Sequence, residues 1–259
     1  TIKILGEMMK KFFIFLLFIL TTISVGISLY LYFPYIKNQK TTTNKIPTAT
    51  ISSNTSILSS NESVNSTFKI IHVPLINQFP ELPSGCEIVA TTMLLNWYGY
   101  KVDKLLLAHS IKTSPLPTYK NGTLYGTDPN ESFIGDPFSK NSYGVYHKPI
   151  IDLINEYTNN EAKNLTGSSF DIILDTIKAN KPVIMWATID MKDPSITKTW
   201  ETNNGTFSWI APEHAYLLIG FDETNVIVND PYDGIEKYID KELFKSRWES
   251  LGSQAVSLK

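Results

Sequence analysis

The only cysteine of the 259-residue chain, Cys86, lies where the sequence predicts the start of a helix. Pro83 and Gly85 interrupt regular structure just before it, and the apolar residues that follow recur near helical spacing. A thiol at a helix N-terminus feels the positive end of the helix dipole, which favours the nucleophilic thiolate. The sequence therefore predicts a reactive cysteine, although a lone cysteine is more often an inert, buried side chain.

A cysteine nucleophile needs a base, a group that orients the base, and donors for a developing oxyanion. His214 begins a strand-like run and Asp230 ends the next one, so a hairpin could bring them together. Simple two-strand register does not place them opposite each other, so a bulge or strand twist would have to supply the contact. Gln78 could donate its amide beside the Cys86 N–H. Each residue also has a structural alternative, since Asp230 precedes Pro231 and could be a turn former.

Two glutamates flank the key residues. Glu87 is interpreted as a charge at a helix N-terminus, and Glu213 as a solvated loop charge. The remaining histidines are too scattered to predict a metal site, and no CxxC or HExxH motif is present, so no metal or cofactor is expected. They are His72, His109 and His147, predicted to be structural or exposed.

Residues 1–36 are predicted to be a membrane anchor or a signal segment. No residue from Phe12 to Ile36 is charged, and a helix of that length, roughly 36 Å, can cross a hydrocarbon core of about 30 Å. Aromatic residues near its end favour a retained anchor, whereas Lys10 and Lys11 before the apolar run also fit a cleaved signal. The following domain is then expected to be extracellular, either tethered to the cell membrane or secreted.

Residues 37–68 are rich in Ser, Thr and Asn and cannot bury enough apolar area to offset their ordering entropy, so they are predicted to be a disordered linker. Residues 69–259 form the predicted folded domain. The net charge of −2 and the lack of a basic stripe argue against a nucleic-acid partner.

Within this domain helices come first and strands second, which is typical of an α+β fold. Residues 113–146 are predicted to be a long loop whose aromatic side chains either line a groove or pack on the core, and the Thr-, Asn- and Trp-rich segment before His214 is predicted to be another loop. The predicted helices begin at Cys86 and span Val102–Ile111, His147–Tyr157, Ser168–Asn180 and Lys241–Ser250, the last capped by Asp240; the predicted strands are Pro182–Ile189, His214–Phe221, Asn225–Asp230 and residues 236–239.

An ordered set of motifs then resembles a known family. NQFPELPSGCEIVATTMLLNWYG, FIGDPFSKNSYGVYHKPI, KPVIMWATI, PEHAYLLIGFD and VNDPYDG are similar to the C39-like family of bacterial proteins, the second C39 peptidase-like group. The resemblance covers residues 70–259. It implies a papain-like cysteine-peptidase fold, with N-terminal helices packed on a C-terminal antiparallel sheet.

The resemblance also implies roles for four residues. By position, Cys86 is the nucleophile, His214 the general base and then acid, Asp230 its orienting partner, and Gln78 the oxyanion donor. In related C39 domains of bacteriocin exporters the glutamine stands closer to the cysteine. The expected function is a membrane-tethered, extracytoplasmic cysteine peptidase acting on a peptide or protein substrate. Two alternatives stay open, a catalytically silent binding module and a cysteine acyltransferase with the same triad.

Overall fold

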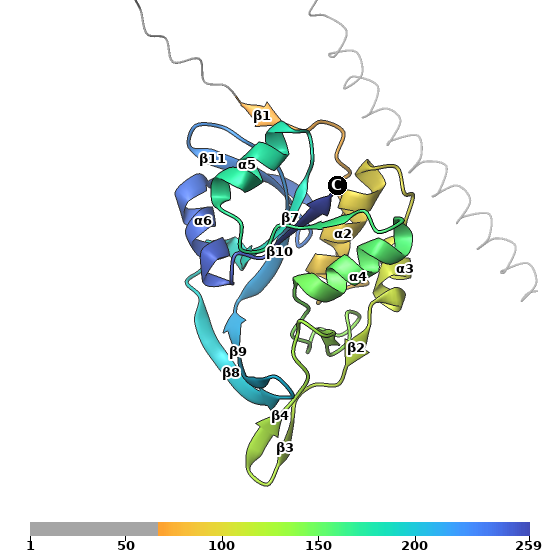
Figure 1. The fold of residues 1–259 in the computed structure, drawn as a ribbon, viewed down its shortest axis with the longest axis vertical. Coiled ribbons are helices and arrows are strands. Elements are labelled where there is room, and N and C mark those ends of the chain that lie inside the picture. The colour runs from red at the N-terminus through yellow and green to blue at the C-terminus, as the bar shows by residue number, and fades with distance from the viewer. Residues whose placement is uncertain (1–66) are drawn as a thin grey trace, which may run out of the picture. The chain divides into compact units, whose positions relative to one another are not determined.

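A computed structural model describes residues 67–259, which are built around a seven-stranded sheet (Figure 1). Its order is β12-β11-β10-β7-β13-β6, with β1 added against β10, and every pairing is antiparallel. The strands are β1 (Phe68–Lys69), β6 (Ala162–Asn164), β7 (Val183–Thr188), β10 (Glu213–Phe221), β11 (Asn225–Asp230), β12 (Ile235–Asp240) and β13 (Ala255–Leu258).

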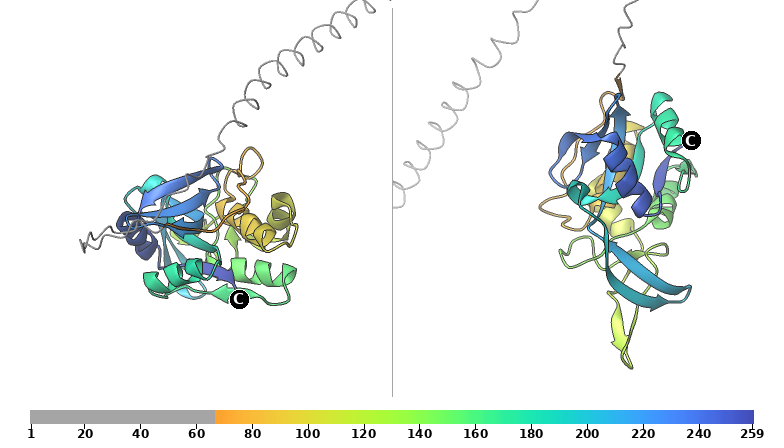
Figure 2. Two further views of the ribbon diagram at one scale, coloured as in Figure 1. Left: turned by 90° about the horizontal axis from the view of Figure 1, so that it is seen from above. Right: turned by 90° about the vertical axis from the view of Figure 1, so that its left-hand side faces the viewer.

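Helices cover both faces of this sheet (Figure 2). Along β10, Ala215, Leu217 and Ile219 join the core that contains α2, α3 and α4, whereas Tyr216 and Leu218 join the core that contains α5 and α6. The strand is apolar throughout because both of its faces are buried. The helices are α2 (Cys86–Trp97), α3 (Lys104–Ser110), α4 (His147–Tyr157), α5 (Phe170–Lys178) and α6 (Lys241–Ser250).

The helix that carries the cysteine is buried on every side. All residues from Cys86 to Leu95 are buried, and the helix packs against β10 and β7 as well as against α3 and α4. A helix enclosed in this way is apolar all round instead of amphipathic. Its first residue is therefore held rigidly against the sheet.

Most predicted elements of the domain are present near their predicted bounds. Helix α4 spans the predicted residues, and α6 begins after Asp240, whose carboxylate accepts a hydrogen bond from Leu243 N at 2.9 Å. Strands β10 and β11 pair antiparallel as predicted. The mixed composition and the antiparallel sheet agree with the predicted α+β class.

Two segments that were predicted to be loops contain strands, so that prediction is wrong. β8 and β9 form a hairpin that joins β3 and β4 in a four-stranded sheet, seen at the lower end of Figure 1. Most of β8 is exposed, so its sequence lacks the apolar alternation that marks a half-buried strand. The additional strands are β2 (Thr113–Ser114), β3 (Thr118–Lys120), β4 (Thr123–Tyr125), β5 (Phe133–Ile134), β8 (Ser195–Thr202) and β9 (Gly205–Ala211).

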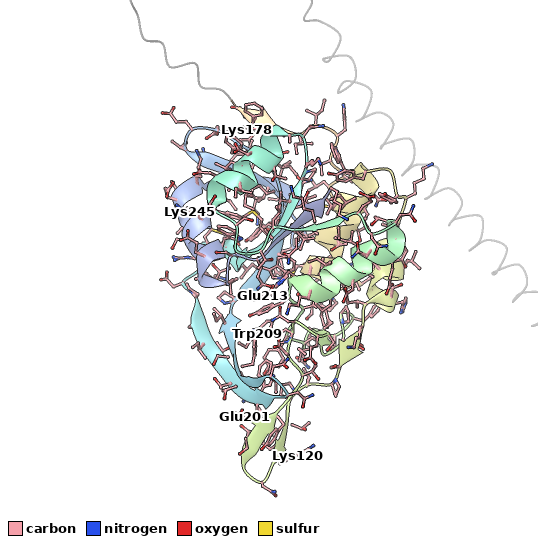
Figure 3. The ribbon with its side chains drawn as sticks, viewed as in Figure 1. Lys120, Lys178, Glu201, Trp209, Glu213 and Lys245 are labelled. Atoms are coloured by element: carbon pink, nitrogen blue, oxygen red, sulfur yellow. The ribbon has the colours of Figure 1, made fainter. Side chains whose placement is uncertain are left out.

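The four-stranded sheet is called the arm here. An aromatic cluster lies where the arm meets the rest of the domain, and Figure 3 shows Trp209 and Glu213 at this junction, with Lys120 and Glu201 farther out. The Tyr143 ring lies 5.2 Å from the rings of both Trp200 and Trp209. The aromatic residues of segment 113–146 are thus divided, since Tyr143 packs in this cluster while Tyr119 is exposed. Whether the exposed ones line a groove stays a prediction.

The predicted anchor (1–36) and nearly all of the predicted linker (37–68) lie outside the described residues. Within residues 67–259, no helix has the length and apolar character needed to cross a membrane. Membrane attachment through the N-terminal segment therefore stays a prediction.

Trp186 offers a test of how the core is held together. Its side chain is fully buried, and its indole N–H donates to Val145 O at 2.9 Å. We expect Trp186→Phe to lower the free energy of unfolding by about 1–3 kcal/mol, because a buried carbonyl loses its donor. The measurement is urea denaturation. Trp97→Phe is the matched control, since its indole donates to Ile71 O in an exposed position where water can replace it. Equal losses in the two variants would contradict this expectation.

Candidate active site

Cys86 is the first residue of α2 and lies against β10. Gly85 is the N-cap and supplies no side-chain hydrogen bond, and a side chain there would collide with Leu82. The thiol is buried, and its Sγ lies 3.3 Å from Oε2 of Glu87, to which it donates. The N–H groups of the first helical turn have no acceptor within the helix. The cysteine thus combines a buried thiol with unused backbone donors.

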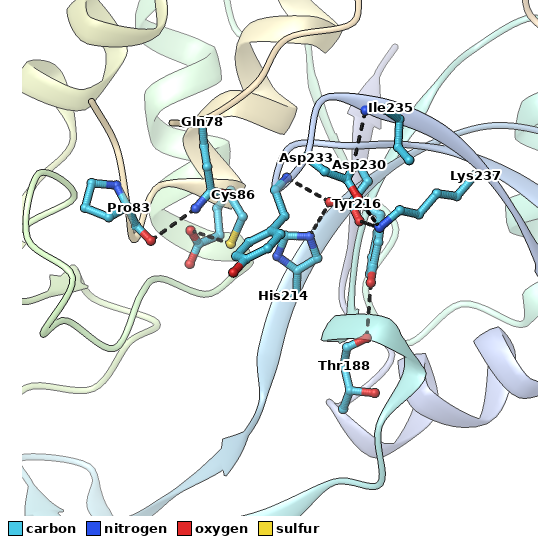
Figure 4. Close-up of polar contacts among 12 residues, drawn as sticks. Gln78, Pro83, Cys86, Thr188, His214, Tyr216, Asp230, Asp233, Ile235 and Lys237 are labelled. Carbon is cyan, nitrogen blue, oxygen red and sulfur yellow. Dashed lines mark hydrogen bonds and ion pairs between the residues drawn. The ribbon is translucent and has the colours of Figure 1, made fainter. Parts of the chain in front are cut away.

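His214 and Asp230 form a buried contact. Nε2 of His214 lies 2.7 Å from Oδ1 of Asp230, and the two residues are 2% and 0% exposed. In Figure 4 the imidazole lies between the Cys86 side chain and the Asp230 carboxylate. Since Nε2 is engaged by the carboxylate, Nδ1 is the nitrogen left for the thiol.

A β-bulge in β10 makes this contact possible. Leu218 pairs with Val228, but the next pair along the ladder is Gly220 with Ile227, so Ile219 is an extra residue on β10. Such a bulge shifts the register of the two strands by one residue. The side chains that follow it change face relative to the partner strand.

The register decides which residue of β10 lies beside Asp230. With the bulge, the ladder continues to place Asp230 opposite Tyr216, one diagonal step from His214 and on the same face. Without it, Asp230 would lie opposite Leu217, whose side chain points to the other face. The structure therefore supplies the bulge that simple pairing of the two strands lacks.

Asp230 is held in its ionised form by three donors. Burial alone would raise its pKa, but hydrogen bonds from His214, from Lys237 and from the Tyr232 N–H outweigh burial and hold the pKa below its usual value. Lys237 Nζ lies 2.7 Å from Oδ2, and the Tyr232 N–H donates to Oδ1 at 2.8 Å. An ionised Asp230 accepts a hydrogen bond from the Nε2–H of His214, which fixes the imidazole tautomer.

Lys237 is a residue that the sequence did not single out. It also bonds Asp233 Oδ2 at 2.7 Å, and its own pKa is raised because these two carboxylates outweigh the effect of burial. In the β11–β12 ladder Asp230 pairs with Ile235, so Lys237 is its diagonal neighbour. The Asp233-Gly234 pair in the sequence could have indicated this contact. It marks a tight turn between two strands, which brings Lys237 near Asp230.

Gln78 is buried next to the start of α2. Its Nε2 donates to Pro83 O at 3.1 Å, which leaves a second amide hydrogen, and its backbone N–H donates to Pro231 O at 2.8 Å. Within residues 67–259 no partner is present for its buried Oε1. Lys104 supports the same loop through Asn77 O at 2.7 Å. Gln78 therefore connects the segment before Cys86 with the turn after Asp230.

Glu87 lies in the first turn of α2 as predicted, but the interpretation of Glu213 as a solvated loop charge is wrong, because this residue begins β10 and one of its carboxyl oxygens is buried. Glu87 is 0% exposed, and its Oε1 accepts a hydrogen bond from the Val145 N–H at 2.7 Å. Glu213 has a buried Oε1 with no partner among residues 67–259. Burial is the main reason that the pKa of Glu87 rises to about 7, and burial together with the Glu87 charge raises that of Glu213 well above its usual range. Glu87 is thus shielded from water, and Glu213 is partly exposed with one carboxyl oxygen shielded.

The same surroundings act on the cysteine. Burial raises the pKa of the Cys86 thiol well above its usual value, and the Glu87 and Glu213 charges raise it further, while the Ala215 backbone lowers it. In the resting protein these effects oppose the stabilisation of a thiolate that the helix N-terminus was expected to provide. The thiol needs a base to become a nucleophile.

Sγ of Cys86 and one oxygen each of Glu87 and Glu213 lie within 4.8 Å of one another. A metal ion would require all three groups to be deprotonated. Burial favours the protonated form of each of them. This cluster is therefore better suited to holding protons than to holding a metal.

Comparison with known proteins places the chain in a family. Residues 70–256 match the peptidase C39-like family, so the chain belongs to that family. The uncharacterized protein YvpB of Bacillus subtilis strain 168 is 36% identical over 203 residues, which cover 78% of this chain and 80% of YvpB. A crystal structure from Bacillus anthracis, described as a candidate C39-like peptidase, is 35% identical with a TM-score of 0.69 and covers 75% of this chain and 98% of that one.

Family membership and the C39-like fold are thus established, and the predicted resemblance is confirmed. Of the predicted site residues, His214 and Asp230 are in direct contact, and Cys86 and Gln78 lie on the neighbouring helix and loop (Figure 4). Their catalytic roles stay predictions.

The pH dependence of stability tests the environment of Asp230. Its pKa is lower in the folded protein than the ordinary value of about 3.9, so its ionised form stabilises the fold above that pH and the contribution is lost as the pH falls through the folded pKa. We expect the stability difference between the wild type and Asp230→Asn to be constant from neutral pH to about 5 and to shrink below about 4. Denaturation across a pH series measures it. A difference that is unchanged or larger in acid would contradict this account.

Proposed function

We propose that this chain is a cysteine peptidase that hydrolyses amide bonds of a peptide or protein substrate, with a papain-like arrangement of Cys86, His214, Asp230 and Gln78. The observation that carries the proposal is the buried 2.7 Å contact of His214 Nε2 with an ionised Asp230. With Nε2 engaged by the carboxylate, Nδ1 is the ring nitrogen left for the thiol, and the imidazole lies between Cys86 and Asp230 (Figure 4). Family membership supports the same class of reaction.

In the first half-reaction the Cys86 thiol attacks the substrate carbonyl carbon. Nδ1 of His214 takes the thiol proton, a C–S bond forms, and the imidazolium is stabilised by Asp230. The imidazolium then gives its proton to the leaving amine as the C–N bond breaks. A water molecule, deprotonated by the same imidazole, attacks the thioester and releases the acid and the thiol.

The oxyanion formed in each half-reaction needs donors. The Cys86 N–H lies in the first turn of α2, where the helix offers it no acceptor. The second amide hydrogen of Gln78 is left over after the bond to Pro83 O. Together they would form an oxyanion hole beside the sulfur.

We also propose a location for the enzyme in the cell. The uncharged run from Phe12 to Ile36 supports a membrane tether, with the catalytic domain outside the cytoplasm. A single cysteine, which cannot form an intramolecular disulfide, is compatible with that setting when the thiol is functional.

One observation favours a catalytically silent binding module instead. The hydrogen bond of Cys86 Sγ goes to Glu87, and the thiol pKa is raised by burial and by the two nearby glutamates. A silent module predicts slow thiol labelling that does not depend on His214. An acyltransferase would use the same residues, with an amine in place of water in the second half-reaction.

The role of His214 is tested by labelling Cys86 with a neutral alkylating agent, iodoacetamide, near pH 6. General-base assistance contributes about 10²–10⁴ in rate, so His214→Ala should label at least about 100-fold more slowly than the wild type. His109→Ala is the matched control, because His109 is exposed and its ring lies 4.7 Å from that of Phe138 instead of in the contact with Asp230. Cys86→Ala should lose both labelling and peptide hydrolysis. Equal labelling of wild type and His214→Ala would refute the peptidase proposal.

Gln78 is tested by separating hydrolysis from alkylation. Loss of one oxyanion donor costs about 10²–10³ in kcat, so Gln78→Ala should lose that much hydrolysis of a peptide library. Its labelling by iodoacetamide should keep the wild-type rate, because alkylation builds no oxyanion at a carbonyl. Parallel losses in both assays would show that Gln78 only maintains the fold.

A further inference from the structure

Glu87 and Glu213 have no role in the proposed reaction, although both side chains approach the Cys86 sulfur. Glu87 comes from α2 directly after the nucleophile, and Glu213 comes from the start of β10 directly before the base. A side chain at Gly144 would collide with Glu87 Oε1, and it would also lie 3.2 Å from Glu213 Oε2. The two carboxyl groups therefore meet over the same glycine, beside the thiol.

No positive charge neutralises this pair within residues 67–259. Neither glutamate takes part in any of the salt bridges that this part of the chain contains. In the described part of the chain, Glu87 accepts hydrogen bonds from the Val145 N–H at 2.7 Å and from the Cys86 thiol at 3.3 Å. Glu87 is buried, and one oxygen of the partly exposed Glu213 is buried as well. Two carboxyl groups with oxygens within 4.8 Å of each other are not both ionised in such a place without a cation, so at least one of them holds a proton.

We propose that Glu87 and Glu213 are positioning residues that share one proton and thereby set the pH range in which the Cys86 thiol acts as a nucleophile. The inference rests on the proposed function in that it takes Cys86 to be the nucleophile.

The pair acts on the thiol through its charge. When both carboxyls are protonated the pair is neutral, and a thiolate next to it meets no negative charge. When one ionises, the carboxylate accepts the S–H of Cys86 and opposes the loss of its proton. The Val145 N–H favours Glu87 as the carboxyl that ionises, and the unpartnered oxygen of Glu213 favours it as the one that keeps the proton. The pKa of the Cys86 thiol is therefore lower at acid pH, where the pair is neutral, than at a pH where one carboxyl is ionised.

Other titratable groups face the pair from the elements packed around it. From α2 the Cys86 thiol faces it, and from the segment before α4 the Tyr146 phenol lies close enough for the Glu213 charge, after burial, to raise its pKa. His214 follows Glu213 on β10, but its ring is turned to Asp230. The hairpin β8–β9 contributes the apolar rings of Phe207 and Trp209 against Tyr146. None of these groups supplies a cation that would remove the need for a shared proton.

Replacement by glutamine mimics a carboxyl that stays protonated. Each single variant leaves one carboxyl that can still ionise, so the decisive variant is the double Glu87→Gln, Glu213→Gln. The rate at which iodoacetamide labels Cys86 is measured across pH for the full chain of the double variant and of the wild type. The rate of the double variant is then divided by the wild-type rate at each pH. We expect a ratio near 1 at acid pH and a rise to tenfold or more, about one pKa unit of relief, at alkaline pH.

Controls separate this effect from a change of fold. Glu223→Gln removes one charge from the exposed β10–β11 turn and should give a ratio near 1 at every pH. Each single variant should give a smaller rise than the double variant. A ratio for the double variant that does not change with pH would overturn the proposal. The His214→Ala test is independent of this ratio, so failure of the pair and failure of the peptidase proposal are distinguishable.

A measurement on the wild type keeps the proposal testable if the double variant does not fold. Carboxyl carbon NMR of the full chain should show a glutamate that titrates near neutral pH, far above the ordinary value of about 4.3. Titration of every glutamate carboxyl at ordinary acid pH would overturn the proposal.

Discussion

The register of β10 against β11 is the constraint on which the candidate site depends. Side chains alternate along a strand, so a shift of one residue moves a side chain to the other face of the sheet. The extra residue at Ile219 puts Asp230 and His214 on the same face. Without it the imidazole would lose the partner that orients it, whatever the position of the cysteine.

The second requirement is that the sulfur stays in place. Helix α2 is enclosed by the sheet and by α3 and α4, so Cys86 at its first residue has little freedom to move. The segment before it is tied to the turn after Asp230 by the Gln78 N–H bond to Pro231 O. Helix, loop and turn therefore support one another around the sulfur.

The acidic groups of the site have opposite environments. Asp230 is buried with three donors, which hold its pKa below the usual value. Glu87 is buried with the Val145 N–H and the thiol, and Glu213 has a buried oxygen that finds no partner among residues 67–259. The three donors to Asp230, one of them the Lys237 ammonium, outweigh the effect of burial on its pKa, whereas the fewer, uncharged donors to the glutamates do not. One carboxylate can thus stabilise an imidazolium while the other two hold a proton near the thiol.

Much of this could be predicted from the sequence, because the signals were local. Helix α4 follows its apolar spacing and α6 follows its cap at Asp240. The burial of Glu87 and of one Glu213 oxygen could not be predicted, because it depends on Gly144 and on packing across the sheet. Lys237 was missed since its contact with Asp230 requires the β12 register, and the arm was missed because its strands are largely exposed.

The central claim is that His214 activates Cys86 to form an acyl-enzyme. Its most direct measurement is the mass of the full chain after brief incubation with an activated peptide ester and an acid quench. The account predicts a mass increase of one acyl group, located on the peptide that contains Cys86 and lost in His214→Ala. An acyl group on another residue, or equal acylation in the His214→Ala variant, would contradict it.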